Sequence, residues 1–467
     1  MEKCRLIVAI VVAKVLIWLA RLAGSQGTAL PGRIARLIYP SILEVLGKNI
    51  TEEIIVVTGT NGKTTTTNMV AEILKEHNYS IVHNSAGANM LTGITTAFIE
   101  KTNLTGTKKF DYALLETDEA NVPLLLKEVT PKVVLITNFF SDQLDRYGEL
   151  EYIINLIKDA VRDTNIELVL NADDPLVSHF HRDTGLHCWY FGFDKTQYDT
   201  TNNLESKEGR FCVICGHELT FERYHYAQLG KFYCPQCENQ NPRPNFKARD
   251  LVMDPHISFY INDILIQSPY QGFYNAYNIL AAVSIAKLVG MRDGEIFEAI
   301  KRYEPRAGRM ESFIINGKRV VLILVKNTTG LNQALSAISY DDRTKNLLFI
   351  LNDNVADGTD ISWIWSSNLE VIASETFKTN KFICAGIRSG DIAVRVKYTG
   401  FDLENIILVS DLYEGIKRVI AEESETSYIL STYTALLDCR KILLKMEKQN
   451  KPLLDEPRPV QRSEIGK

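Results

Sequence analysis

The sequence predicts an α/β protein: a central domain on a mostly parallel sheet, a small cysteine-rich insertion and a second α/β domain after it. Short apolar strands and helical stretches alternate along the chain from Ile54 onward. A glycine-rich turn that carries one lysine joins the first strand of this series to the first helix. Two Cys-x-x-Cys pairs interrupt the alternation between residues 200 and 245, and the α/β pattern resumes after Asp250.

The bulk composition is that of a globular protein of several domains. The 467 residues are enough for about three domains of ordinary size. The net charge of −5 gives no reason to expect a general affinity for nucleic acid. Four of the eight cysteines are clustered and four are scattered, which fits a reducing cytoplasm and one metal site better than a disulfide framework.

The N-terminal 45 residues are predicted to be a helical segment. The run from Leu6 to Ala20 is strongly apolar, but Lys14 interrupts it and it is shorter than the roughly 20 residues of a membrane span. No convincing small-residue cleavage pattern of a signal peptide follows it. The basic residues Lys3 and Arg5 precede the run. Two interpretations remain open: a helix that packs on the protein, or one that lies at a membrane surface, at the inner face of the membrane.

The glycine-rich turn predicts a nucleotide site. A buried strand over Ile54 to Val57 leads into Gly59-Thr60-Asn61-Gly62-Lys63-Thr64-Thr65, and an apolar helical pattern follows. Backbone N–H groups and the helix N-terminus would face the phosphates, Lys63 would supply charge, and Thr64 would reach Mg²⁺. The generic phosphate-loop pattern fails at Val57, where it requires glycine.

Further strands and helices complete the predicted sheets. Repeated strand–helix units imply parallel strands with ligands at their carboxyl ends, where polar clusters stand in this sequence. The expected strands of the central domain are Tyr112 to Leu115, Val133 to Ile136 and Leu168 to Leu170, and those of the last domain are Val320 to Val325 and Leu347 to Leu351. The expected helices include Val122 to Glu128 and Tyr152 to Arg162.

The two cysteine pairs predict a zinc ribbon. Eighteen residues separate Cys212 and Cys215 from Cys234 and Cys237, a spacing typical of a tetrahedral zinc site. Four thiolates close the coordination shell, so the ion would be structural. Four reduced cysteines or a redox pair are the alternatives. The nearby His217 and His225 are not needed as ligands and are expected at the surface.

Several motifs resemble those of the Mur ligases, the ATP-dependent enzymes that add amino acids to peptidoglycan precursors. The glycine-rich turn is similar to their nucleotide loop, and the Glu116 segment to the end of the strand with a Mg²⁺-binding glutamate. The segment from Thr137 to Gly148 resembles Thr-Asn-x-x-x-Asp-His-Leu-Asp, with Gln143 in place of the histidine. The other matching segments are Asn171 to Pro175, the pair Asn275 and Asn278 near the adenine, and the Gly-Arg-Met-Glu element that contains Arg309.

Two departures point to the MurT branch of this family, the synthetase subunits of lipid II isoglutaminyl synthases. Ordinary Mur ligases lack a Cys₄ ribbon in the central domain and carry Asp-x-x-His-Asn-Pro where this chain has Val325 to Gly330. The segment from Asn352 to Trp365 resembles the MurT element Asn-Asp-x-x-Ala-Asp-Gly-x-Asp-x-Ser-Trp-Ile-Trp. The resemblance implies a central ATP-binding domain over residues 46–311, with the ribbon inserted over residues 205–242. A partner-binding C-terminal α/β domain would follow over residues 312–447, and a tail over residues 448–467.

The resemblance also implies a reaction. The α-carboxylate of the D-glutamate in the lipid II stem peptide is activated by ATP as an acyl phosphate and becomes an amide, giving D-isoglutamine. Lys63 is the implied catalytic lysine, and Thr64 and Glu116 are the implied Mg²⁺ ligands. The ammonia comes from a GatD-type glutaminase in a heterodimer, whose Cys-His pair Asp360 would complete, with Asp357 as second choice.

Two other functions compete with this one. A stand-alone Mur-type amino acid ligase would use the same loop, but the ribbon and the Lys326-Asn327 element argue against it. A zinc-ribbon scaffold that only binds nucleotide would show no turnover. The scattered Cys4, Cys188, Cys384 and Cys439 offer no glutaminase nucleophile, so nitrogen from glutamine requires a second chain.

Overall fold

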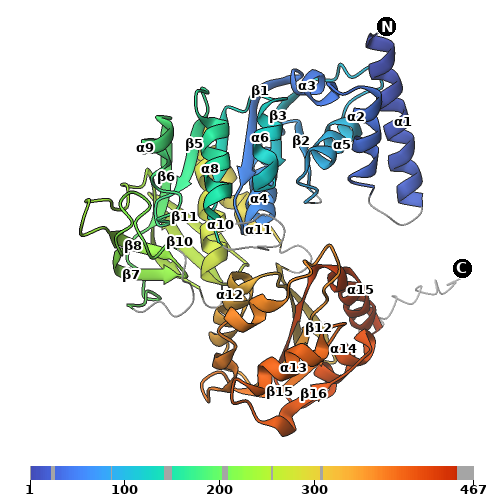
Figure 1. The fold of residues 1–467 in the computed structure, drawn as a ribbon. Helices are drawn as coiled ribbons and strands as arrows, with labels where there is room; N and C mark the ends of the chain where they lie inside the picture. Colours follow the sequence, from blue (N-terminus) through green and yellow to red (C-terminus); the bar gives the residue numbers. More distant parts are fainter. Residues whose placement is uncertain are drawn as a thin grey trace, which may run out of the picture. The chain divides into compact units, whose positions relative to one another are not determined.

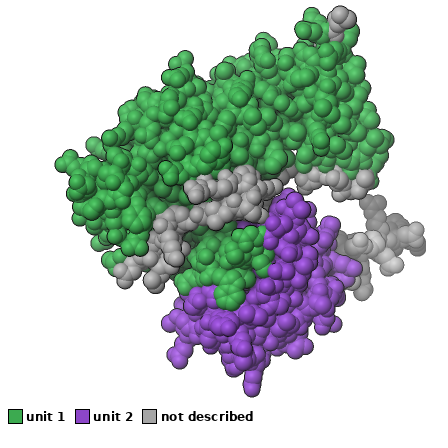
Figure 2. Space-filling view, in the orientation of Figure 1, with its two compact units in different colours: residues 1–304, 327–340, 360–368 green, residues 305–326, 341–359, 369–467 purple. Residues whose placement is uncertain are grey.

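The computed structural model (Figure 1) describes residues 2–22, 27–85, 87–140, 150–201, 209–253, 256–304 and 309–449. The chain forms two compact units, coloured separately in Figure 2. The first contains residues 1–304, 327–340 and 360–368, and the second contains residues 305–326, 341–359 and 369–467. Gln143 and all but the first two residues of the predicted tail lie outside the described residues.

A nine-stranded sheet forms the frame of the first unit, in the order β11-β10-β9-β6-β5-β4-β1-β3-β2. The seven strands from β9 to β2 are parallel, and β10 and β11 form an antiparallel edge. The strands are β1 (Ile50–Thr58), β2 (Ile81–His83), β3 (Phe110–Glu116), β4 (Val133–Ile136), β5 (Glu167–Asn171), β6 (Cys188–Phe193), β9 (Phe246–Val252), β10 (Ile257–Ile261) and β11 (Ile264–Ser268).

Helices cover both faces of this sheet because its central strands are apolar on both sides (Figure 1). Ile55 and Val57 of β1 belong to one core, and Ile54 and Val56 to the other. The first core is closed by α4 (Lys63–Glu76), α10 (Phe273–Leu288) and α11 (Asp293–Arg302). The second is closed by α1 (Glu2–Leu22), α2 (Leu30–Ile38), α3 (Ile42–Gly47), α5 (Leu91–Lys101), α6 (Val122–Leu126), α8 (Leu150–Val161) and α9 (Phe180–Thr184).

The N-terminal helix α1 is only half embedded in this second core. Its inner side buries Leu6, Ile10 and Ile17, whereas Trp18 and Leu22 on its outer side are 60% and 67% exposed. Among the described residues, no helix combines the length and the apolarity that crossing a bilayer requires. The segment is helical, and one side of α1 packs on the protein. Contact of its other side with a membrane stays a prediction.

The cysteine-rich insertion between β6 and β9 contains a separate two-stranded sheet. Strands β7 (Thr220–Tyr226) and β8 (Leu229–Tyr233) are antiparallel and joined by the two-residue turn Ala227-Gln228. Ala227 adopts a positive φ of 44° in this turn.

The second unit is a smaller α/β sheet, in the order β12-β13-β17-β14-β15-β16. Only β12 runs antiparallel to its neighbour. The strands are β12 (Arg309–Ile315), β13 (Lys318–Leu324), β14 (Lys345–Ile350), β15 (Thr379–Ala385), β16 (Ile406–Leu408) and β17 (Thr426–Ser431). The helices are η3 (Leu369–Ala373), α13 (Ser389–Lys397), η4 (Leu403–Asn405), α14 (Leu412–Ala421) and α15 (Tyr433–Gln449).

The predicted fold class is confirmed: a parallel-sheet domain with a cysteine-rich insertion, followed by a second α/β unit. Three further elements remain to be described. The helix α12 (Thr328–Ser339) and the 3₁₀ helix η2 (Ser362–Ser366) follow β13 and β14 in sequence but belong to the first unit. The 3₁₀ helix η1 (Glu119–Asn121) follows β3.

Candidate nucleotide and metal sites

The glycine-rich turn lies where the sequence predicts it, between the carboxyl end of β1 and the N-terminus of α4. Gly59 and Gly62 adopt φ values of 116° and 87°, which residues with a side chain rarely adopt. A Cβ on Gly62 would stand 2.0 Å from Oδ1 of Asn278, so only glycine fits against α10. The turn thus leaves its own backbone as the lining of the site, as phosphate binding requires.

The segment after β4 fixes the turn through a set of short hydrogen bonds. The Asn61 amide donates to Oδ1 of Asn138 (3.0 Å), and the Asn138 side chain donates back to the Asn61 carbonyl (3.2 Å). The Phe140 amide donates to Oγ1 of Thr60 (3.0 Å), and Oγ1 of Thr137 donates to the Asn61 carbonyl (2.7 Å). These hydrogen bonds tie the turn to the end of β4.

Lys63 is the only basic side chain of the turn, and it stands among carboxylates. Its Nζ lies 3.1 Å from Oε2 of Glu119 and donates to the Gly59 carbonyl at 2.5 Å. Burial disfavours the charged amine, but Glu119, Asp118 and Glu116 outweigh this and raise the Lys63 pKa. The carboxylates around Lys63 therefore favour its charged form.

Thr64 and Glu116 meet beside Lys63. Oγ1 of Thr64 donates to Oε1 of Glu116 at 3.0 Å, and Glu116 is only 3% exposed. Asn89 donates to the same carboxylate oxygen at 3.4 Å, and the Asn84 side chain forms two hydrogen bonds with the Glu116 backbone (2.7 and 2.9 Å). A hydroxyl and a carboxylate are hard oxygen donors of the kind Mg²⁺ prefers, so this pair fits the predicted ion.

Of the remaining predicted ATP-binding residues, the structure describes the side chains of Asn275, Asn278 and Thr65 but not that of Arg309. Asn278 lies directly against Gly62, and its Nδ2 donates to Oδ1 of Asn275 at 3.2 Å. Thr65 is buried in the first turn of α4. The side chain of Arg309 lies outside the described part of the structure, so its predicted role stays a prediction.

The Asn171 to Pro175 segment is buried between elements of the central domain and is not a solvent-exposed acidic turn. Burial raises the pKa of the Asp173 and Asp174 carboxyls, for Asp174 to about 7. Asp173 accepts from the Tyr277 hydroxyl (2.7 Å), and Asp174 accepts from the Phe139 amide (3.1 Å). These acids connect β5 to α10 and to the segment that fixes the glycine-rich turn.

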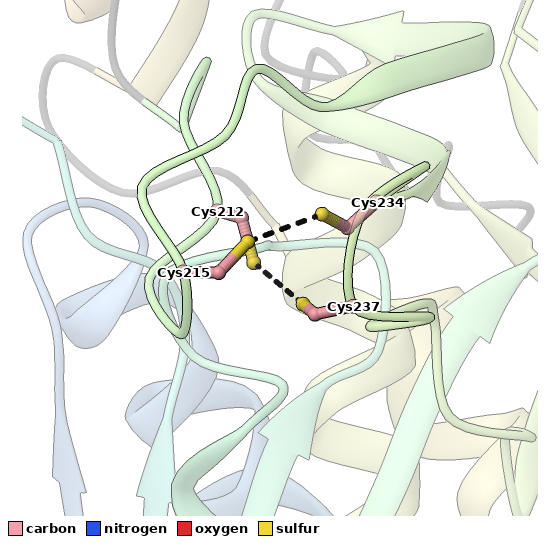
Figure 3. Close-up of side chains that lie close together, drawn as sticks. All are labelled: Cys212, Cys215, Cys234 and Cys237. Atoms are coloured by element: carbon pink, nitrogen blue, oxygen red, sulfur yellow. Dashed lines mark hydrogen bonds between the residues drawn. The ribbon is translucent and has the colours of Figure 1, made fainter.

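The four clustered cysteines converge on one point (Figure 3). All four Sγ atoms lie within 4.8 Å of one another, with Cys212–Cys237 and Cys215–Cys234 each 3.5 Å apart. Tetrahedral Zn–S bonds require sulfurs about 3.8 Å apart, so the cluster fits a Zn²⁺ ion. Burial opposes ionisation of Cys212, but amides of Ile214 and Cys215 donate to its sulfur and lower its pKa to about 7.

One expectation about this insertion was wrong. His225 is not a surface residue: it is 5% exposed, and its Nδ1 lies 2.7 Å from Oδ1 of Asp199. Its ring packs among Phe193, Phe273 and Tyr277, because this side of β7 packs against the central domain and is not exposed to solvent. His217 is exposed, as expected.

The two aspartates predicted for a partner site differ in environment. Asp357 is 5% exposed and caps α15 by accepting from the Thr434 amide (2.7 Å) and hydroxyl (2.6 Å). Asp360 is exposed, and its carboxylate is oriented by the Ser362 amide (2.8 Å) and hydroxyl (2.9 Å). Of the two, Asp360 is the one that presents its carboxylate at the surface.

Comparison with known proteins identifies the family. Residues 57–234 match the Mur ligase middle domain, and residues 324–436 match the MurT ligase C-terminal domain. The chain is 35% identical over 419 residues to the lipid II isoglutaminyl synthase (glutamine-hydrolyzing) subunit MurT of Staphylococcus aureus (strain COL), covering 89% of this chain and 93% of that protein. The chain belongs to the MurT family. The Streptococcus pneumoniae (strain ATCC BAA-255 / R6) MurT subunit is 36% identical over 423 residues, covering 90% and 92%.

Solved structures support the same fold at lower identity. A pseudomurein peptide ligase type C from Methanothermus fervidus superposes with a TM-score of 0.66 at 21% identity, covering 86% of this chain and 80% of that one. MurF from Acinetobacter baumannii gives 0.62 at 13% identity, covering 89% and 80%. Mur ligases depend on ATP and Mg²⁺, and the MurT-family chain carries the loop, lysine and carboxylate arrangement described above.

Sequence reasoning missed three contributors to this MurT-family site. Glu119 lies within a matching motif but received no predicted role, although it is the ion-pair partner of Lys63. Asn89 contacts Glu116 from a distant loop, and Gln228 of the ribbon contacts the Phe139 carbonyl at 2.6 Å. The acidic character of the segment after Glu116 was the only signal for any of them.

Proposed function

We propose that this chain is the synthetase subunit of a lipid II isoglutaminyl synthase, which converts the α-carboxylate of the stem-peptide D-glutamate to an amide. The observation that carries the proposal is the constellation of buried Lys63, half-buried Thr64 and buried Glu116, where α4 begins and β3 ends, in a chain of the MurT family. The constellation supplies a fixed cation and an oxygen-rich ion site beside a loop lined by its own backbone.

The chemistry follows from the poor reactivity of a carboxylate. A carboxylate oxygen attacks the γ-phosphorus of ATP, the bond to ADP breaks, and an acyl phosphate forms. Ammonia then attacks the carbonyl carbon, the bond to phosphate breaks, and the nitrogen loses its extra proton to water. Lys63 stabilises the charge on the transferring phosphoryl group, and the turn's backbone orients it.

Two ions belong to this proposal. Thr64 and Glu116 would hold Mg²⁺, which neutralises phosphate charge when bound. Cys212, Cys215, Cys234 and Cys237 would hold Zn²⁺, which leaves no open coordination position and therefore stabilises the insertion without taking part in the reaction.

The nitrogen source is proposed to be a GatD-type glutaminase subunit in a heterodimer. Among the described cysteines outside the cluster, Cys384 and Cys439 are buried and burial raises the pKa of each thiol to about 12, so neither suits a nucleophile. The exposed Asp360, already oriented by Ser362, is the residue we assign to the partner's Cys-His pair.

A lipid-linked substrate calls for contact with a membrane, and α1 offers the surface for it. Exposed apolar residues recur every three to four positions along one side of it, at Val8, Val11, Val15, Trp18 and Leu22, and the exposed Ile7 and Leu19 lie beside them. The first 38 residues carry six basic side chains against one acidic one, in a chain whose net charge is −5. Two of these basic residues, Arg21 and Arg36, pair with Glu100 and Glu128. An apolar stripe with a tryptophan, on a segment with an excess of basic residues, matches an anionic bilayer surface, here the cytoplasmic leaflet.

Vesicle sedimentation tests this contact. The chain is expected to sediment with vesicles rich in phosphatidylglycerol and to stay in solution with phosphatidylcholine alone. Replacing Trp18 and Leu22 by serine should release it, whereas the same change at the equally exposed Tyr398 and Leu403 of the second unit should not. Equal sedimentation of both variants would contradict the assignment of α1.

Nitrogen-donor competition tests the reaction itself. The purified chain with ATP, Mg²⁺ and lipid II should form an amide with ammonia, form none with glutamine alone, and accept no amino acid. Glutamine should become effective when the glutaminase subunit is added. Ligation of an amino acid by the chain alone would favour the stand-alone Mur-type ligase instead.

A further inference from the structure

The hairpin of the ribbon connects the cysteine cluster to the core of the central domain. Strand β8 ends at Tyr233, directly before Cys234, so the open end of the hairpin carries the cluster. The opposite end, the turn Ala227-Gln228, is buried: Ala227 is 4% exposed and Gln228 is fully covered. Ala227 and Leu229 belong to the same apolar core as α4, the helix of the nucleotide loop.

Gln228 reaches from this turn to the segment that shapes the glycine-rich turn. Its Nε2 donates to the Phe139 carbonyl at 2.6 Å, and its side chain also hydrogen-bonds the Asp174 carboxylate. Asp174 in turn accepts from the Phe139 amide at 3.1 Å. Both backbone groups of Phe139 are thus fixed by the Gln228–Asp174 pair.

Phe139 stands between the two residues that hold the nucleotide loop. Its predecessor Asn138 bonds Asn61 in both directions (3.0 and 3.2 Å), and its successor Phe140 bonds Thr60 (3.0 Å). The Phe140 ring also stacks on Tyr226 of β7, with centroids 6.4 Å apart. A displacement of the hairpin would therefore move the peptide that anchors the loop.

A second set of contacts fixes the hairpin to the sheet. The Gly230 amide donates to the Asp173 carbonyl at 2.9 Å. Within the hairpin, a Cβ on Gly230 would stand 2.2 Å from the Arg223 carbonyl of the facing strand, so only glycine allows this close pairing. On the same hairpin, Nδ1 of His225 lies 2.7 Å from Oδ1 of Asp199, a residue that precedes the hairpin in the chain. The hairpin is thus bonded to the central domain at several points along its length.

We infer that Gln228 is a positioning residue for the nucleotide loop, through which the metal-bound ribbon maintains the affinity of the site for MgATP. Gln228 touches no nucleotide; it acts on Thr60 and Asn61 through Phe139. This role depends on the proposed nucleotide site, but it adds a function for the ribbon beyond local stability. Without this hydrogen bond the loop leaves its binding geometry more often, and the free energy needed to restore that geometry lowers the affinity for MgATP by roughly tenfold for one buried hydrogen bond.

The test compares two methionine substitutions in the full chain. Gln228→Met keeps the length of the side chain but removes the donor, and Gln236→Met makes the same change at an exposed position of the second knuckle. Calorimetric titration with MgATP and hydrogen exchange of the peptide spanning residues 58–66 are measured for both and for the wild type. We expect weaker binding by roughly tenfold and faster exchange for Gln228→Met only.

Each outcome has a distinct meaning. Unchanged affinity and exchange in a folded Gln228→Met variant would overturn the inference and leave the proposed function intact. A wild-type chain that does not bind MgATP would overturn the proposed function instead. If Gln228→Met does not fold, the wild-type chain treated with a zinc chelator is measured: faster exchange over residues 58–66 supports the coupling, and exchange confined to residues 209–241 refutes it.

Discussion

Lys63→Met is the perturbation that bears most directly on the nucleotide site, and the structure sets its magnitude. Lys63 and Glu119 form a 3.1 Å ion pair whose side chains are only 10% and 13% exposed. Removing one partner leaves a buried carboxylate uncompensated, which costs about 3–5 kcal/mol of unfolding free energy. Losing a preorganised charge at the transferring phosphoryl group costs about 10²–10³ in rate.

These two effects can be separated by a second change. In the double variant Lys63→Met/Glu119→Gln the carboxylate in direct contact with Lys63 is no longer stranded, so part of the lost unfolding free energy should return; Glu116 and Asp118 still lack the cation, so the recovery should be incomplete. The rate should stay low, because the cation is still missing. Lys75→Met is the matched control: this lysine lies on the same helix, but its side chain is 50% exposed and pairs with Glu72.

The assay is ADP release with lipid II and saturating ammonia, alongside chemical unfolding of each variant. Ammonia removes any dependence on the glutaminase subunit. Turnover by Lys63→Met within about threefold of the wild type would refute the assignment, because a cation in contact with the transferring group is worth far more than that.

The same geometry makes three further predictions. Glu116→Gln should raise the Mg²⁺ concentration needed for half-maximal ADP release by at least roughly tenfold, since a neutral amide is a weaker ligand for a hard cation; an unchanged Mg²⁺ dependence would remove this residue from the ion site. Asp360→Asn should abolish glutamine-dependent amidation and leave the ammonia-dependent rate intact, whereas Asp402→Asn, which alters an exposed cap of the same kind, should change neither; parallel loss of both activities in Asp360→Asn would contradict the triad role. Elemental analysis should find one zinc per chain, and chelation should lower the melting temperature; a metal-free chain of unchanged stability would leave the cysteines as reduced thiols.

The loop and the cysteine cluster could be predicted from the sequence because both are local. In each, the residue types and their spacing within a few positions already define the chemistry, and the strand before Gly59 is apolar enough to be recognised alone. The parallel sheets were predictable for the same reason, from repeated strand–helix units. The family resemblance rests on several motifs that occur in the family's order along the chain, which is stronger evidence than any one of them.

The parts that could not be predicted depend on which segments meet in three dimensions. Nothing near Gln228 in the sequence indicates that a ribbon turn enters the core beside Phe139. His225 looks like a surface residue of a small ribbon, and it is buried only because Phe273 and Tyr277 of α10 cover it. Pairing of Glu119 with Lys63 likewise depends on where the end of β3 lies relative to β1, which residue spacing alone does not fix.

The proposed function requires that this site activate a carboxylate by transfer of the ATP γ-phosphoryl group. Lipid II whose D-glutamate α-carboxylate carries a heavy oxygen isotope tests this step most directly, with the purified chain, MgATP and ammonia. Each amide formed should place one labelled oxygen in inorganic phosphate, alongside one ADP. Amidation with unlabelled phosphate, or with the label in AMP, would contradict the proposed transfer.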